Sequence, residues 1–368
     1  MAYTGYEVET VELETLLGDQ STEMELEEEA TIVSADSSAA TKVVPAAGCQ
    51  VPKASNGNFI ARAPNKITHV VLHTIEGSYT HAIESWKKGT ACFKPHYAAK
   101  SDGEITQIVA ERFLAQHANK ANPYSIGIEQ DGFSHKTTSF TEAMYTSVSN
   151  LVRDICNRYS IPKDRTHIIG HDQAPGTTHG DPGGYFDWDY FIALVNWNGT
   201  TAATRPVRIV VDSDSYSTWP VSLTSTAWTQ VAREAMNRPP HPKHSWSAKA
   251  YRASASATNH DPVAFLGTVP SAGTYEISAW WPVISGNCSA VTINAFIDGS
   301  ATASITKVVD QSTLTGSTRR TLALPYTPMW RSLGSVTLKA GSSFWVEVSR
   351  KSAKRGYVYA DAIKLLRR

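Results

Sequence analysis

Hydrophobic and polar residues follow two different patterns in the two halves of the chain. Between residues 67 and 198, short β-branched and apolar runs alternate with longer segments whose apolar residues recur every three or four positions. The first pattern predicts buried strands and the second predicts amphipathic helices. We expect strands at 67–74, 96–99, 105–110, 125–129 and 166–171, and helices at 80–88 and 141–159. Strands that alternate with helices predict an α/β domain with a mixed central sheet.

Local signals mark the ends of these elements. Thr141 precedes the longer helix and Thr80 the shorter one, and both are expected to act as N-terminal caps. The triplet Ser101-Asp102-Gly103 is typical of a turn, which predicts a hairpin between the second and third strands.

After residue 207 the chain changes to short strands separated by turns rich in Gly, Ser and Pro. This spacing predicts a β-sandwich. Trp280 and Trp281 are neighbours on one strand, so one is expected to face the core and the other solvent. The expected elements are strands at 207–211, 275–281, 291–297, 303–309, 336–338, 344–348 and 357–365, and one helix at 229–237.

Composition divides the chain further. Eleven of the 34 acidic residues, and none of the 34 Lys and Arg, lie in residues 1–41, which leaves 23 acidic residues for a mildly basic body. An acidic segment followed by Ser, Ala and Thr predicts a disordered or partner-bound tail. We therefore expect a tail at 1–45, an α/β domain at 46–198, a linker at 199–206 and a sandwich domain at 207–368.

Three residues carry the most specific chemistry. His73 ends one predicted strand, His171 ends another, and Asp181 follows ten residues later in a loop rich in Pro, Gly and Thr. Two imidazoles and a carboxylate make up the ligand set of a catalytic zinc site with one open position, at metal–ligand distances of about 2.0–2.2 Å. Any one of these histidines alone is more often structural, but three matching contexts together favour a Zn²⁺ site.

The motifs resemble those of a known family. His73, Ser125-Ile126-Gly127-Ile128-Glu129, Gly170-His171-Asp172-Gln173-Ala174-Pro175-Gly176, Asp181-Pro182-Gly183 and Phe186-Asp187-Trp188 occur in the order found in the zinc N-acetylmuramoyl-L-alanine amidases. That family includes peptidoglycan recognition proteins and amidase-type phage lysozymes. The resemblance implies hydrolysis of the amide between N-acetylmuramic acid and L-alanine in peptidoglycan.

The resemblance covers about residues 60–198 and implies a role for each site residue. His73, His171 and Asp181 would be the metal ligands, and Glu129 the catalytic carboxylate that moves the proton of the attacking water. Many members carry Lys two residues before the last ligand, whereas this chain has His179, which would donate to the oxyanion. A structural alternative for Glu129 is an ion pair with Arg112 or Lys120.

Three further residues are expected to contact substrate. His96 and Tyr97 precede the predicted turn, where family members often place a Tyr or His that lines the substrate groove, and His117 resembles a groove histidine that contacts the peptide. Among the cysteines, Cys49 and Cys92 could pair if the protein is exported, and the sequence leaves this pairing open. Cys156 is expected to be a core residue.

The second domain resembles the carboxyl-terminal module of golvesins and xanthan lyases. The resemblance covers about residues 207–367, and it is carried by Gly273–Pro282 and Gly356–Ile363, with Val211-Asp212 and Tyr251-Arg252 in support. It implies a sandwich that binds polysaccharide.

Partners and location follow from these features. We expect peptidoglycan as substrate, no nucleic acid and no membrane span, because no apolar run is long enough to cross a bilayer. The first residues lack the basic and apolar regions of a secretory signal. Delivery to the wall as a phage endolysin, or as cargo of a contractile injection particle through the acidic tail, is therefore one expectation. A non-catalytic recognition protein and a cytoplasmic muropeptide-recycling amidase are the alternatives.

Overall fold

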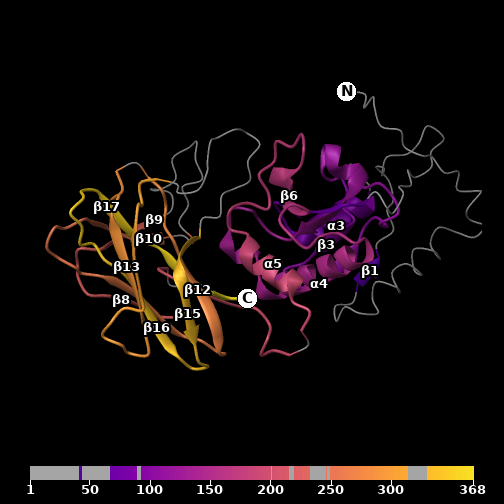
Figure 1. Cartoon of the computed structure of the whole chain (residues 1–368). Helices are drawn as coiled ribbons and strands as arrows, with labels where there is room; N and C mark the ends of the chain where they lie inside the picture. Colours follow the sequence, from indigo (N-terminus) through magenta and orange to yellow (C-terminus); the bar gives the residue numbers. More distant parts are fainter. Residues whose placement is uncertain are drawn as a thin grey trace, which may run out of the picture. The chain divides into compact units, whose positions relative to one another are not determined.

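The computed structural model describes most of the chain from residue 67 onwards. The described residues are 41–43 (backbone), 67–88, 93–199, 201–214, 219–232, 246, 249–284, 286–313 and 330–368. They form two compact units, of which the first ends at Asn196 and the second begins at Trp197 (Figure 1). The finer predicted boundaries at residues 45, 198 and 206 stay predictions.

The first unit is built on a six-stranded mixed sheet, which confirms the predicted fold class. Three neighbouring strands are parallel to one another, with β2 in the middle of the order β5-β2-β6. The hairpin of β3 and β4 is antiparallel, β3 is parallel to β5, and β1 is parallel to β4. The strands are β1 (Thr41–Val43), β2 (His69–Thr74), β3 (Tyr97–Ala99), β4 (Ile105–Gln107), β5 (Ser125–Gln130) and β6 (Ile168–Gly170).

Helices cover both faces of this sheet. On one face α3 packs its buried residues against Ala98 of β3, together with Ile108 and Val109. The neighbouring Tyr97 points to the opposite face, where its hydroxyl donates to Glu111, the carboxylate that pairs with Arg158 of α4. The helices are α3 (Tyr79–Lys88), α4 (Glu142–Arg158) and α5 (Trp188–Asn196), with short 3₁₀ turns η2 (Asn119–Tyr124), η3 (Thr137–Ser139) and η4 (His171–Gln173).

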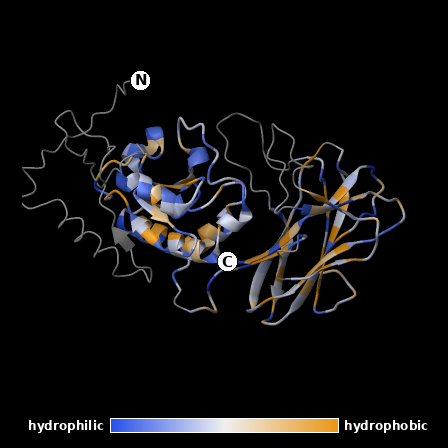
Figure 2. Cartoon of the chain, turned by 180° about the vertical axis from the view of Figure 1, so that it is seen from behind, coloured by the Kyte–Doolittle hydropathy of each residue, from blue (hydrophilic) through white to orange (hydrophobic). Residues whose placement is uncertain are grey.

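The predicted caps have different outcomes. The Thr141 side chain accepts a hydrogen bond from the Met144 N–H at 3.1 Å, so the predicted cap of α4 is confirmed. The prediction for α3 is wrong by two residues. This helix begins at Tyr79, and the Ser78 hydroxyl, not Thr80, accepts from the His81 N–H. In Figure 2 hydrophobic and hydrophilic residues alternate along the helices of the first unit.

The second unit consists of antiparallel sheets around one apolar core. A five-stranded sheet has the order β14-β13-β16-β11-β8, a four-stranded sheet β15-β12-β18-β7, and a small sheet β17-β10-β9. Burial alternates along β16, where Phe344, Val346 and Val348 enter the core. The strands are β7 (Val207–Asp212), β8 (Val221–Leu223), β9 (Thr229–Ala232), β10 (Lys249–Ser254), β11 (Val263–Thr268), β12 (Gly273–Trp280), β13 (Val291–Ile297), β14 (Ile305–Val309), β15 (Arg331–Leu338), β16 (Ser343–Val348), β17 (Tyr357–Ala360) and β18 (Ala362–Arg367).

Two sequence predictions for this unit are wrong. Residues 229–232 form strand β9 and not the start of a helix, because they pair with β10; residues 233–237 lie outside the described residues. Neither Trp280 nor Trp281 faces solvent, since they are 2% and 1% exposed. Trp281 joins the core, while Trp280 contacts the rings of Trp246 and Trp330.

Other predictions are refined or lie outside the described part. The expected strand at 357–365 is divided at Asp361 into β17 and β18. Five described strands were not expected as strands: β1, β8, β9, β10 and β11. Cys156 is buried, as predicted, whereas the Cys49–Cys92 pairing and all of the acidic segment except Thr41–Val43 fall on residues that the structure does not describe. Among the described helices, none combines the length and the hydropathy that crossing a membrane requires.

Candidate active site

The site lies where three parallel strands end at the same edge of the sheet. His73 of β2 is in register with Glu129 of β5, and Leu72 is in register with Gly170 of β6, so His171 follows directly at the same edge. The carboxyl ends of parallel strands are the usual location of ligand sites in α/β proteins. The β-strand pairing thus brings together residues that are about one hundred positions apart in the sequence.

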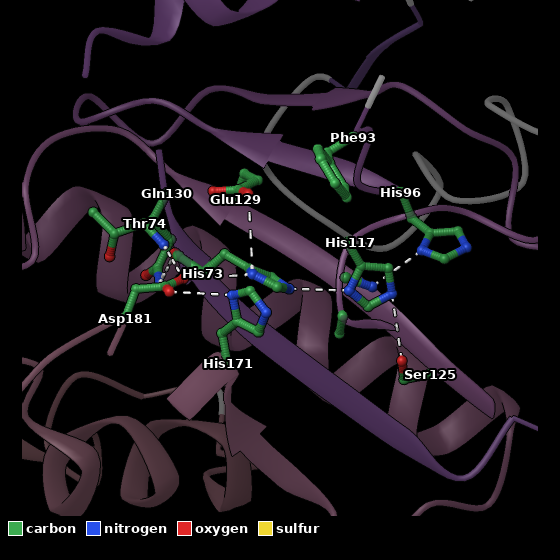
Figure 3. A network of polar contacts seen from close by, with 12 residues as sticks. His73, Thr74, Phe93, His96, His117, Ser125, Glu129, Gln130, His171 and Asp181 are labelled. Atoms are coloured by element: carbon green, nitrogen blue, oxygen red, sulfur yellow. Dashed lines mark hydrogen bonds and ion pairs between the residues drawn. The ribbon is translucent and has the colours of Figure 1, made fainter. Parts of the chain in front are cut away.

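The loop after η4 returns Asp181 to the two histidines. The Asp172 N–H donates to the Asp181 carbonyl at 2.9 Å, and the Thr74 N–H donates to Asp181 Oδ2 at 3.2 Å. His171 Nδ1 lies 3.1 Å from Asp181 Oδ1, and His73 Nδ1 lies 3.4 Å from Asp181 Oδ2. One ligand atom from each of the three side chains falls within 4.8 Å of the others, and all three side chains are buried (Figure 3).

Charge and burial in this triad fit a metal ion. Burial lowers the pKa of His73, which keeps the imidazole neutral, as a ligand must be. Burial opposes ionisation of Asp181, but the neighbouring imidazoles of His171 and His73 outweigh it and hold the pKa of this carboxyl well below its usual range. In the described part of the chain no Lys or Arg pairs with Asp181, and His171 Nε2 has no hydrogen-bond partner. A divalent cation at the three ligand atoms would supply the missing positive charge.

Glu129 lies beside the triad without joining it. Its Oε1 is 4.0 Å from His73 Nδ1, its side chain is 20% exposed, and its Oε2 is buried without a hydrogen-bond partner among the described residues. Burial, together with the carboxylates of Asp181 and Glu76, raises the pKa of Glu129 to about 8. Neither Arg112 nor Lys120 forms a salt bridge with it in the described part of the chain, so the structural alternative has no support.

His179 lies against the ring of His171. Its ring stacks on that of His171, with centroids 4.7 Å apart and planes inclined by 15°, and the residue is exposed. Its backbone N–H donates to the Thr177 hydroxyl at 3.0 Å. The imidazole is thus adjacent to the triad, and its predicted role at the oxyanion stays a prediction.

The three predicted substrate contacts are buried in this structure. His96 accepts from the Gly127 N–H at 3.0 Å and faces the Phe113 carbonyl, while the Tyr97 hydroxyl donates to Glu111 at 2.8 Å. His117, 7% exposed, contacts His73 from the side away from Asp181. Substrate could reach these side chains only after they were uncovered, so their contact with the peptide stays a prediction.

Two residues near the site were not singled out from the sequence. Phe93 is 71% exposed and lies on the side of the site where Glu129 and His117 are seen in Figure 3. Glu76, with a φ of 53°, accepts from the Ser134 N–H at 2.9 Å and contributes to the raised pKa of Glu129. An aromatic residue in a Pro-containing loop, and an acidic residue three positions after a ligand, are the signals that could have identified them.

Comparison with known proteins agrees with this geometry. The family described as N-acetylmuramoyl-L-alanine amidase matches residues 63–184. N-acetylmuramoyl-L-alanine amidase A of Achromobacter lyticus is 34% identical over 164 residues, which are 40% of this chain and 92% of that relative. The chain belongs to the N-acetylmuramoyl-L-alanine amidase family. It is an amidase of peptidoglycan, with a buried His-His-Asp triad suited to a metal ion.

Two further matches cover smaller parts of the chain. The 1,6-anhydro-N-acetylmuramyl-L-alanine amidase AmpD of Haemophilus influenzae is 36% identical over 109 residues, which are 27% of this chain and 57% of AmpD. The family described as Golvesin C-terminal domain matches residues 241–367 in the second unit.

Two solved structures match parts of this chain at low identity. The amidase LysC from Clostridium intestinale is 20% identical, with 42% of this chain and 97% of that chain covered and a TM-score of 0.31. A Paenibacillus xanthan lyase is 21% identical, with 45% and 13% covered and a TM-score of 0.33.

Proposed function

We propose that the amidase is a zinc enzyme in which His73, His171 and Asp181 hold the metal and Glu129 moves the proton. The observation that carries this proposal is that three buried ligand atoms lie within 4.8 Å of one another. The carboxylate of Glu129 lies beside them, with Oε1 4.0 Å from His73 Nδ1. Two nitrogens and one oxygen suit zinc, and three protein ligands leave one position for chemistry.

The residues around the triad account for the steps of amide hydrolysis. A bound zinc ion would supply Lewis-acid chemistry, polarising the carbonyl of the muramoyl group and making water a better nucleophile. Glu129 accepts the proton of the attacking water on its unpartnered Oε2 and passes it to the nitrogen of L-alanine as the C–N bond breaks. The raised pKa of Glu129 suits both proton transfers, since a group whose pKa lies near neutral pH can both accept and return a proton.

We infer that His179 stabilises negative charge on the former carbonyl oxygen. Its exposed ring is stacked on that of His171, which places its ring nitrogens next to the triad where the carbonyl of the substrate would react. Removal of one oxyanion donor typically costs about 2.7–4 kcal/mol of transition-state stabilisation. This is the role that a Lys would have at the same position.

Digestion of purified peptidoglycan tests the reaction directly. We expect free stem peptides with an L-alanine amino terminus and intact glycan strands, both detected by mass spectrometry. Treatment with a chelator should abolish the release, and added Zn²⁺ should restore it, because the chemistry needs the metal. Cleavage that persists in the chelator, or new reducing sugar ends, would contradict the proposal.

The similarity to AmpD makes muropeptide recycling the second candidate for the same chemistry. The digestion should therefore compare intact sacculi with soluble anhydro-muropeptides. We expect sacculi to be hydrolysed, since we propose that the second unit, which matches the Golvesin C-terminal domain, binds wall polysaccharide. Activity restricted to anhydro-muropeptides would favour recycling. The non-catalytic alternative finds no support, because all three ligands and Glu129 are in place.

We further propose that the second unit holds the amidase on wall polysaccharide. Trp345 and Phe296 occur opposite each other on β16 and β13, and their rings stack with centroids 4.9 Å apart. Both are half-buried and lie on the face of the sheet opposite the core residues Phe344 and Val346. Such a pair offers an aromatic surface on which a sugar ring can stack, a role that the buried Trp280 and Trp281 cannot have.

Sedimentation with insoluble peptidoglycan tests this anchor. A second tethered contact raises overall binding by about 10²–10⁴-fold. Trp345→Ala in the full chain should therefore reduce the sedimented fraction while cleavage of small soluble muropeptides stays normal. Val308→Ala removes an exposed apolar side chain from the same sheet and is the matched control. If both variants sediment like the wild type, the Trp345–Phe296 surface is not the anchor.

The route to the wall is a separate proposal. The comparisons support an enzyme that acts on the cell wall, and the acidic segment at 1–45 is the feature that favours docking on a phage or contractile injection particle.

A further inference from the structure

A line of hydrogen bonds runs from the metal triad into the interior of the first unit. His73 Nε2 lies 3.0 Å from His117 Nδ1, and His117 Nε2 lies 3.3 Å from Ser125 Oγ. The Ser125 hydroxyl also lies 2.7 Å from the Ala121 carbonyl oxygen. His73, His117 and Ser125 are all buried (Figure 3).

The far end of this line fixes the direction of every hydrogen bond in it. A carbonyl oxygen can only accept, so Ser125 donates its single hydroxyl hydrogen to Ala121. Ser125 then presents a lone pair to His117, whose Nε2 must carry a hydrogen to donate. A neutral imidazole carries one N–H, so His117 Nδ1 is an acceptor and His73 Nε2 is the donor to it.

These hydrogen-bond directions also determine which nitrogen of His73 carries the hydrogen. If Nε2 of a neutral His73 carries the hydrogen, its Nδ1 holds a lone pair, and this is the nitrogen that faces Asp181 Oδ2 at 3.4 Å. Two electron-rich atoms facing each other in a buried site repel, and a cation between them removes the repulsion. The other tautomer of His73 would place a hydrogen where the metal has to bind.

We propose that His117 is a positioning residue that holds His73 in its ligand-ready tautomer before any metal ion arrives. The inference rests on the metal site proposed above. The ring nitrogen of a metal-bound histidine that does not contact the metal usually donates to a carboxylate, a backbone carbonyl or water. Here a second histidine has that role, and its own orientation is set by a serine and a backbone carbonyl.

The backbone around His117 is shaped to hold its ring in place. A Cβ atom on Gly127 of β5 would lie 2.3 Å from His117 Cγ, so only glycine leaves room for the imidazole over this strand. Asn122 Oδ1 accepts from the backbone N–H groups of His117 and Ala118, at 3.1 and 2.7 Å. Two independent features thus keep the ring against His73.

The affinity of the whole chain for Zn²⁺ tests the inference. It is measured by competition with a chromophoric chelator in two variants of His117. His117→Leu fills the space of the imidazole but offers no acceptor to His73 Nε2, and it should weaken Zn²⁺ binding by about 10–100-fold. His117→Asn places an amide oxygen near the position of Nδ1 and should bind Zn²⁺ nearly as tightly as the wild type. His69→Leu is the matched control and should leave affinity unchanged, because His69 lies on β2 with His73 but contacts Tyr124 and His167. Equal losses in both His117 variants, or no loss in either, would overturn the inference.

A spectroscopic measurement on the metal-free wild type needs no variant. Nitrogen-15 NMR of the histidine side chains should show His73 as a neutral ring protonated on Nε2, and His117 likewise on Nε2. A hydrogen on Nδ1 of His73 would overturn the inference, even if Zn²⁺ binds. If instead the wild type binds no Zn²⁺, the proposed metal site fails while the NMR result still decides the tautomer.

Discussion

His171→Ala is expected to abolish both metal binding and peptidoglycan hydrolysis. The substitution removes one of the three proposed ligands and leaves only His73 and Asp181 to hold the ion. Loss of a residue that only hydrogen-bonds to a metal ligand typically weakens metal binding by about 10–100-fold. Loss of a ligand itself should weaken binding by more than this. Hydrolysis should fall in parallel, because the remaining groups have no Lewis acid to act with. Metal content after gel filtration and release of stem peptides are the two measurements.

The matched control for this change is His167→Ala. His167 lies four residues before His171, is partly exposed, and pairs with Asp164 rather than with the triad. Its variant should keep the metal and the activity of the wild type. A His171 variant that retained zinc at the wild-type level, with or without activity, would show that the ligands lie elsewhere.

The location of this site could be predicted from sequence because strand ends are encoded locally. Runs such as Val70-Val71-Leu72 and Ile168-Ile169 predict buried strands, and His73 and His171 follow them directly. Parallel pairing of β2 with β5 and β6 then brings the ends together without further information. The mixed sheet and the antiparallel character of the second unit followed from the same hydrophobic periods.

What the sequence did not reveal depends on contacts between distant segments. The position of His117 behind His73 depends on the missing Cβ of Gly127, which no pattern around His117 announces. Trp280 is buried because Trp246 and Trp330 cover a strand face that alternation alone assigns to solvent. Residues 229–232 have a helix-compatible composition, but pairing with β10 outweighs that weak preference.

Glu129→Gln is expected to separate catalysis from metal binding. Glutamine keeps the shape of the side chain but cannot accept the proton of the attacking water. General base catalysis contributes about 10²–10⁴-fold, so kcat should fall by that factor, which corresponds to about 2.7–5.4 kcal/mol on the barrier. Zinc should remain bound, because Glu129 lies beside the three ligand atoms and is not one of them. Single-turnover release of stem peptides and metal analysis of the same sample measure both quantities.

Glu84→Gln makes the same substitution on the exposed side of α3, where the carboxylate pairs with Lys87 and Lys88, and should leave both quantities unchanged. The comparison matters because a buried carboxylate can be needed for folding alone, and a melting curve of each variant identifies that case. If the Glu129→Gln protein is well folded, binds zinc and has a near-normal kcat, Glu129 has a structural role and not a catalytic one. Loss of zinc along with activity would instead make it part of the metal site. Retained zinc with a slow reaction is the outcome that the unpartnered Oε2 beside the triad leads us to expect.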